Sequence, residues 1–139
     1  MGGTMVFTNG VFDVLHRGHL EYLCAARDLG TVLIVGVNSD ASTTRLKGPK
    51  RPLVSQDDRA LALTSLRCVD HVVFFDEETP RELIEAITPD VLVKGGDYQT
   101  DEVAGANHVK EHGGKVVIIP FREGYSTSGL IEEIVERFS

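Results

Sequence analysis

Two histidines near the N-terminus have a spacing that could bind an anion. They lie in the run from Thr8 to His19, TNGVFDVLHRGH, which leads from an expected strand into an expected helix. His16 and His19 are three residues apart, so both side chains can point toward the same end of that helix. The helix N-terminus adds unpaired N–H groups and a positive dipole end, and Gly18 allows a ligand to approach the backbone. Histidines at a helix start are often surface or capping residues, but the complete run favours an anion site.

A short basic segment follows the second expected strand. Arg45, Lys47, Lys50 and Arg51 lie within seven residues that include no acidic residue. Such a run is often only a solvated surface. In a chain of net charge −7, however, a phosphate site needs local positive charge, and this segment comes soon after a strand end. We therefore expect it to face the same ligand.

Two further polar segments stand beside expected strands or helices. Lys94-Gly95-Gly96-Asp97 ends the fourth expected strand, and the segment 124–128, GYSTS, precedes the last expected helix. The paired glycines could form a simple turn, and the hydroxyl cluster could be only a helix N-cap. Both segments also suit a phosphorylated ligand that approaches the backbone.

The segments that must position these residues alternate between strands and helices. Strands are expected at residues 5–8, 31–37, 71–75, 90–94 and 115–119. Helices are expected at residues 18–29, 40–46, 56–67, 80–87, 103–112 and 128–138. This rhythm predicts right-handed crossovers and an α/β fold, a Rossmann-like doubly wound five-stranded parallel sheet, in a single domain over residues 1–139. Such sheets bind ligands at the carboxyl ends of their strands, near the topological switch point.

Length and composition restrict the class of protein. A chain of 139 residues can bury one core, and its 14 basic against 21 acidic residues argue against non-specific nucleic-acid binding. No apolar run reaches the roughly 20 residues of a membrane span, and the N-terminus lacks signal-peptide features. We therefore expect a cytoplasmic protein with no membrane partner. Cys24 and Cys68 have no CxxC spacing, so we expect reduced core cysteines rather than a zinc site or a disulfide.

Together the polar segments resemble those of the cytidylyltransferase-like nucleotidyltransferases, the HxGH family. The resemblance covers the whole chain, and no Walker A or GxGxxG motif supports another nucleotide-binding class. Within the family, the chain resembles the branch that adenylylates heptose 1-phosphate. The segments that carry this resemblance are 8–19, 37–40 (VNSD), 45–48 (RLKG), 93–98 (VKGGDY) and 124–128. The family's fold is the Rossmann-like sheet already expected from the strand rhythm.

The resemblance implies roles for individual residues. His16 and His19 would contact the ATP phosphates and stabilise charge on the α-phosphate, and Lys47 matches the family's catalytic lysine. The nucleotide-binding residues that it implies are Val11, Phe12, Asp13, His16, Gly18, His19, Lys47, Gly96, Asp97, Ser126, Thr127 and Ser128. Those that it implies for the sugar phosphate are Asn9, Asp40, Arg45, Arg59 and Lys94. We expect no protein nucleophile and no protein metal ligand, because Mg²⁺ would arrive with ATP and keep most of its waters.

The reaction implied is transfer of AMP from ATP to D-glycero-β-D-manno-heptose 1-phosphate, giving ADP-heptose and pyrophosphate for surface-glycan synthesis. The resemblance also implies a homodimer and, because the chain has no room for a kinase, a separate sugar kinase. One alternative is a CTP-dependent enzyme that acts on glycerol 3-phosphate or a similar small phosphate. Another is a nucleotide-binding regulatory module without turnover. Phe121 stands directly after Pro120, where the glycerol-phosphate branch carries arginine, and this difference favours the heptose reaction.

Overall fold

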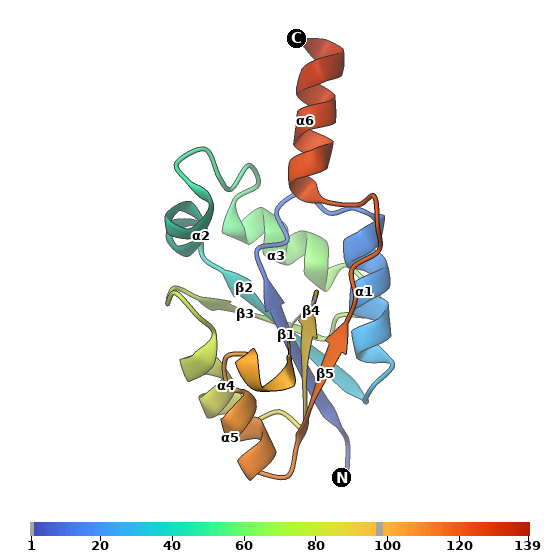
Figure 1. Ribbon diagram of the computed structural model, residues 1–139, viewed down its shortest axis with the longest axis vertical. Helices are drawn as coiled ribbons and strands as arrows, with labels where there is room; N and C mark the ends of the chain where they lie inside the picture. Colours follow the sequence, from blue (N-terminus) through green and yellow to red (C-terminus); the bar gives the residue numbers. More distant parts are fainter. Residues whose placement is uncertain (1, 97–98) are drawn as a thin grey trace.

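The computed structural model describes residues 2–96 and 99–139, and its centre is a parallel five-stranded sheet (Figure 1). The strand order is β3-β2-β1-β4-β5. The strands are β1 (Met5–Gly10), β2 (Val32–Asn38), β3 (His71–Phe75), β4 (Val91–Gly95) and β5 (Lys115–Ile119). All four neighbouring pairs run parallel, which confirms the predicted doubly wound α/β fold.

The helices follow the strands in alternation, as the sequence predicts. They are α1 (Arg17–Arg27), α2 (Asp40–Lys47), α3 (Gln56–Thr64), α4 (Arg81–Ile87), α5 (Ala106–Glu111) and α6 (Thr127–Phe138), with the 3₁₀ helix η1 at Thr100–Glu102. Helix α5 is shorter than the predicted 103–112. Its N-cap Gly105 has φ 82°, a left-handed conformation in which an α-helix cannot continue. In Figure 1, α6 projects from the sheet at the end opposite the N-terminus.

Both faces of the sheet are covered, and neighbouring residues of β1 show how. Val6 is fully buried in a cluster with Leu23 of α1 and Leu63 of α3. The next residue, Phe7, is fully buried in a second cluster with Ile84 of α4 and Val109 of α5. Successive side chains of a strand point to opposite faces, so α1 and α3 cover one face while α4 and α5 cover the other. This double burial explains why the predicted strand 31–37 is almost wholly apolar.

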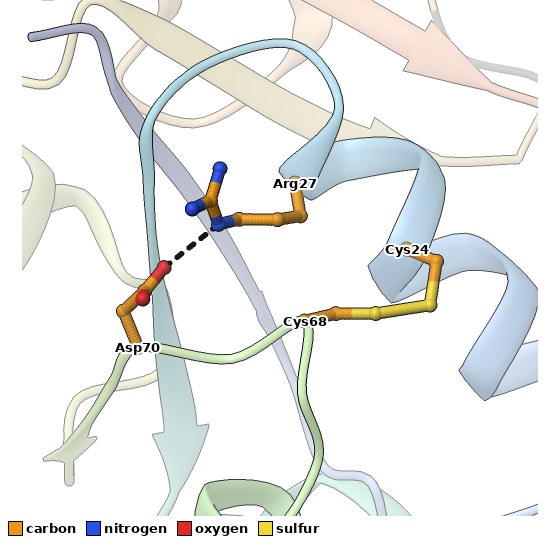
Figure 2. Close-up of a disulfide and its surroundings, with 4 residues drawn as sticks. All are labelled: Cys24, Arg27, Cys68 and Asp70. Atoms are coloured by element: carbon orange, nitrogen blue, oxygen red, sulfur yellow. Dashed lines mark ion pairs between the residues drawn. A yellow bond between two sulfur atoms is a disulfide. The ribbon is translucent and has the colours of Figure 1, made fainter.

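The expectation of two reduced cysteines was wrong, because Cys24 of α1 and Cys68 form a disulfide (Figure 2). They are 44 residues apart in sequence, but α1 packs beside the connection from α3 to β3 and brings their Cα atoms to 5.2 Å. That distance lies within the usual range for a disulfide. An ion pair between Arg27 and Asp70, 2.9 Å long, joins the same two segments.

None of the helices in the described part of the chain combines the length and apolar character needed to cross a membrane.

Candidate functional site

A cavity of about 710 Å³ opens at the carboxyl ends of β1 and β4. β1 pairs with both β2 and β4, so the chain winds away from this point in two directions. This is the topological switch point at which doubly wound sheets bind ligands. The lining includes residues of the β1–α1 loop, the end of α2, the end of β4, the segment after β5 and the start of α6. Of the predicted site residues, it includes Asn9, Val11, Phe12, Asp13, His16, Gly18, His19, Lys47, Lys94, Ser126, Thr127 and Ser128.

His16 and His19 lie together at the start of α1. Their rings stack with centroids 3.8 Å apart, and the His16 backbone N–H donates to His19 Nδ1 at 3.3 Å. Because Nδ1 accepts a hydrogen bond, the proton of the neutral His19 ring sits on Nε2. The His16 Nδ1 atom is buried and has no hydrogen-bond partner within the described part of the chain. The pair thus offers polar ring atoms to a ligand in the cavity.

The surroundings of both imidazoles favour the neutral ring. Burial, together with the nearby His16, lowers the pKa of His19 to about 4. Burial also lowers the pKa of His16. An anion in the cavity would oppose this effect, since a nearby negative charge favours the protonated ring.

Gly18 has a packing role in addition to the one predicted from sequence. A Cβ at this position would lie 2.9 Å from the His16 ring and 3.0 Å from the Tyr125 Cβ. The glycine therefore allows the segment before α6 to close against the start of α1. Aromatic packing continues this contact, because the His16 and Tyr125 rings are stacked 6.2 Å apart.

Two lysines from distant parts of the chain meet in the cavity. Lys47 is the last residue of α2, and Lys94 lies in β4. Burial lowers the pKa of Lys94, and the charge of Lys47 lowers it further. Both lysines line the same cavity, so the basic segment and the KGG segment contribute positive charge to one place.

The start of α6 forms part of the cavity wall, beside the start of α1. Ser126 caps the helix by accepting a hydrogen bond from the Gly129 N–H at 2.9 Å. The Thr127 hydroxyl donates to the Val14 carbonyl at 3.3 Å, which fixes the helix start against the β1–α1 loop. The N-cap interpretation is therefore confirmed for Ser126, while the phosphate-binding role of residues 126–128 stays a prediction.

Three residues predicted to bind the sugar phosphate do not line the cavity of the described chain. The Arg59 side chain is only 1% exposed, and its guanidinium donates to the carbonyls of Val11, Asn38 and Val54 and to Asp40 Oδ1. Asp40 is thus engaged by Arg59, and Arg45 bonds to Asp76 instead. These charges hold loops together around the site. Gly96 also lies outside the cavity lining, and Asp97 lies outside the described residues.

Several lining residues were not among the predicted site residues. Tyr22 shares a 2.6 Å hydrogen bond with the Thr8 hydroxyl, and burial raises its pKa to about 12. Phe121 contacts Tyr22, and a Cβ on Gly95 would lie 2.5 Å from the Phe121 ring. Arg122 bonds Glu21 at 2.9 Å, although 101 residues separate them. The polar segment after the last strand was the only local signal, and it gave no partner for these side chains.

Over residues 2–96 and 99–139, histidine, cysteine and carboxylate side chains do not gather in groups of three or more that could hold a metal ion.

Comparisons with known proteins point in one direction. A family model described as cytidylyltransferase-like matches residues 7–133. The chain is 54% identical over 138 residues to the Bifunctional protein HldE of Trichlorobacter lovleyi, and 59% identical over 133 residues to that of Wolinella succinogenes. These matches cover 99% and 96% of this chain but 28% and 27% of the relatives, so the chain spans about a quarter of their length. A crystal structure described as the lipopolysaccharide core biosynthesis protein of Thermoplasma volcanium aligns with a TM-score of 0.70 at 30% identity, covering 90% of this chain and 100% of that one.

Proposed function

Because the chain belongs to the cytidylyltransferase-like family, we propose that it transfers AMP from ATP to D-glycero-β-D-manno-heptose 1-phosphate. The observation that carries the proposal is the meeting of His16, His19, Lys47 and Lys94 around one cavity at the switch point. Two imidazoles and two amines suit a ligand that bears several phosphate charges. The starts of two adjoining helices, α1 and α6, both line the cavity and add further N–H donors.

The chemistry needs positioning and charge stabilisation more than a protein nucleophile. A phosphate oxygen of the acceptor attacks the α-phosphorus of ATP, and the bond between the α-phosphorus and the bridging oxygen to the β-phosphate breaks. Pyrophosphate leaves with that electron pair. The acceptor phosphate is already an anion, so no strong general base is required. Magnesium enters with ATP as part of the substrate, and the lysines and histidines stabilise the charge that remains.

The sequence relatives support heptose as the acceptor. The Bifunctional protein HldE sequences match almost the whole chain at 51–59% identity, and the segments 45–48 and 93–98 resemble the heptose branch. We further propose a homodimer in the cytoplasm, where the Cys24–Cys68 bond is an exception to the reduced thiols usual in that compartment. A sugar kinase, on the same polypeptide or a separate one, would supply the sugar 1-phosphate.

An activity grid of nucleotides against sugar phosphates tests the proposal through pyrophosphate release. ATP with heptose 1-phosphate should exceed CTP with glycerol 3-phosphate by at least about 10²-fold in kcat/KM, or roughly 2.7 kcal/mol. Buried polar groups that fit one base would be left unpaired by the other, which is the physical source of such discrimination. A preference for CTP would transfer the chain to the cytidylyltransferase alternative. Binding of ATP without any turnover would instead support the alternative of a nucleotide-binding regulatory module.

A further inference from the structure

Asp13 carries a buried carboxylate whose bonds all lead to one loop. The residue is 1% exposed. Asp13 Oδ2 accepts from Arg51 Nε at 2.7 Å and from the Leu53 N–H at 2.8 Å, while Oδ1 accepts from the Val54 N–H at 2.8 Å. Every one of these donors belongs to residues 51–54. The carboxylate is therefore occupied by the protein, in contrast to the nucleotide-binding role expected from sequence.

The loop that Asp13 holds continues directly from the end of α2. Lys47 ends that helix four residues before Arg51, and the Thr44 hydroxyl donates to the Arg51 carbonyl at 2.7 Å. On the other side, Asp13 precedes His16 by three residues in the β1–α1 loop. Asp13 thus joins the segment that carries the histidines to the segment that carries Lys47, across 38 residues of sequence.

The ion pair between Asp13 and Arg51 also stabilises this link between the two segments. The Arg51 side chain is 16% exposed, so this ion pair is largely shielded from water. Burial alone would raise the pKa of Asp13, but the amides of Leu53 and Val54 and the Arg51 guanidinium outweigh burial and lower it. The carboxylate stays ionised while its charge is matched by donors, so it does not repel phosphates in the adjoining cavity.

We infer that Asp13 is a positioning residue, whose carboxylate holds residues 51–54 so that Lys47 faces the same cavity as His16 and His19. The expected effect on kcat rests on the proposed function, whereas the expected effect on the loop of residues 51–54 does not. A catalytic amine displaced by about 1 Å can lower turnover by up to about 10²-fold. Asp13 then acts through Lys47 and does not touch the substrate.

A double-mutant cycle separates this role from general stabilisation and from direct substrate contact. Asp13→Asn keeps the size of the side chain but removes the charge and one acceptor oxygen. We expect kcat to fall by about 10- to 100-fold, with the KM for ATP changing less than threefold. Lys47→Ala should then lower kcat by less than about threefold in the Asp13→Asn background, because the lysine is already displaced. Equal losses from Lys47→Ala in both backgrounds, or a rise in the KM for ATP alone, would overturn the inference.

The loop itself provides a readout that does not need activity. Limited trypsin digestion should cut after Lys47 and Lys50 at least about tenfold faster in Asp13→Asn than in the unsubstituted protein. The exposed Asp57→Asn in α3 is the matched control and should change neither the cleavage rate nor kcat. If Asp13→Asn does not fold, Arg51→Gln tests the same contact while leaving the two amide donors in place. Unchanged trypsin cleavage in the folded variants would overturn the positioning role. Faster cleavage in Asp13→Asn, together with no nucleotidyl transfer by the unsubstituted protein, would overturn only the proposed function.

Discussion

The two histidines of the site are held in place before any ligand arrives. The His16 backbone fixes the His19 ring, and the stacked rings restrict each other. An electrostatic stabiliser works best when it needs no reorganisation at the moment of reaction. We therefore expect that removing one imidazole affects turnover more than folding.

His19→Ala should lower kcat by on the order of 10²-fold or more, the usual loss for one preorganised charge stabiliser. The measurement is pyrophosphate release under saturating substrates, with circular dichroism to verify folding. His71→Ala, outside the cavity, is the matched control and should retain turnover. A folded His19→Ala protein with near-normal kcat would remove the proposed mechanism.

Burial of His19 also predicts a pH dependence of stability. Its folded pKa of about 4 lies below the ordinary value of 6.5, so the folded state prefers the neutral ring. The contribution of His19 to the free energy of unfolding is fully present above about pH 6.5 and is lost as pH falls toward about 4. Over this range the free energy of unfolding changes by at most about 1.4 kcal/mol per pH unit. His19→Gln should flatten the curve of unfolding free energy over this range in urea titrations. Parallel curves for the two proteins would show that the folded pKa is not lowered.

Lys47 should matter more for turnover than for binding. Lys47→Ala is expected to lower kcat by a larger factor than it raises the dissociation constant for ATP, because the amine meets charge that grows in the transition state. Lys47→Arg should restore only part of the activity, since a planar guanidinium does not replace a compact ammonium. Calorimetry of ATP binding beside steady-state kinetics measures both quantities. Weakened binding with an intact kcat would make Lys47 a ground-state contact only.

At the scale of elements, a disulfide fastens the helix that carries His19. The bond from Cys24 to Cys68 closes a loop that includes β2, α2 and α3, and the Arg27–Asp70 ion pair reinforces it. Arg59 and Asp13 hold the same loop from the side of the cavity. The elements around the site are thus joined by cross-links as well as by the sheet.

Replacing both cysteines, Cys24→Ser with Cys68→Ser, should lower the free energy of unfolding by about 2–5 kcal/mol, the usual range for a native disulfide. Urea denaturation with and without reductant measures the effect. Reductant should destabilise the unsubstituted protein and leave the double variant unchanged. Titration of two free thiols in the non-reduced protein would contradict the disulfide.

At the scale of the whole molecule, the doubly wound sheet gathers the site from the full length of the chain. The cavity takes residues from the β1–α1 loop, from β4 and from the start of α6. A ligand that fills it should therefore stabilise the whole fold, since unfolding of the sheet destroys every wall of the cavity.

Magnesium ATP at about 100 times its dissociation constant should stabilise the folded chain by about 2.7 kcal/mol. Differential scanning calorimetry should show this as a rise in Tm of several degrees. Magnesium CTP at the same concentration should give a smaller rise if the base pocket selects adenine. An unchanged Tm with millimolar ATP would mean that the cavity does not take this nucleotide.

The order of strands and helices could be predicted from the sequence because each element depends on local patterns. Strands 71–75 and 115–119 match β3 and β5, and Ser55 caps α3 as expected. The residues near the cavity were also found from contiguous motifs, since HxGH places two rings at one helix start. The predictions for the sugar-phosphate residues were less complete, because the sequence does not reveal which charged side chains face inward, as the buried Arg59 of α3 illustrates.

The sequence by itself therefore determined the parallel α/β sheet, the helix start that carries His16 and His19, and the family to which the chain belongs. Only the tertiary structure decided the pairs Cys24–Cys68, Asp13–Arg51 and Glu21–Arg122, which are 44, 38 and 101 residues apart. Periodicity and capping act over a few residues, so they specify elements. Partners at such separations are chosen by how the crossovers place one element against another, and by the loss of water that makes each buried charge require a partner.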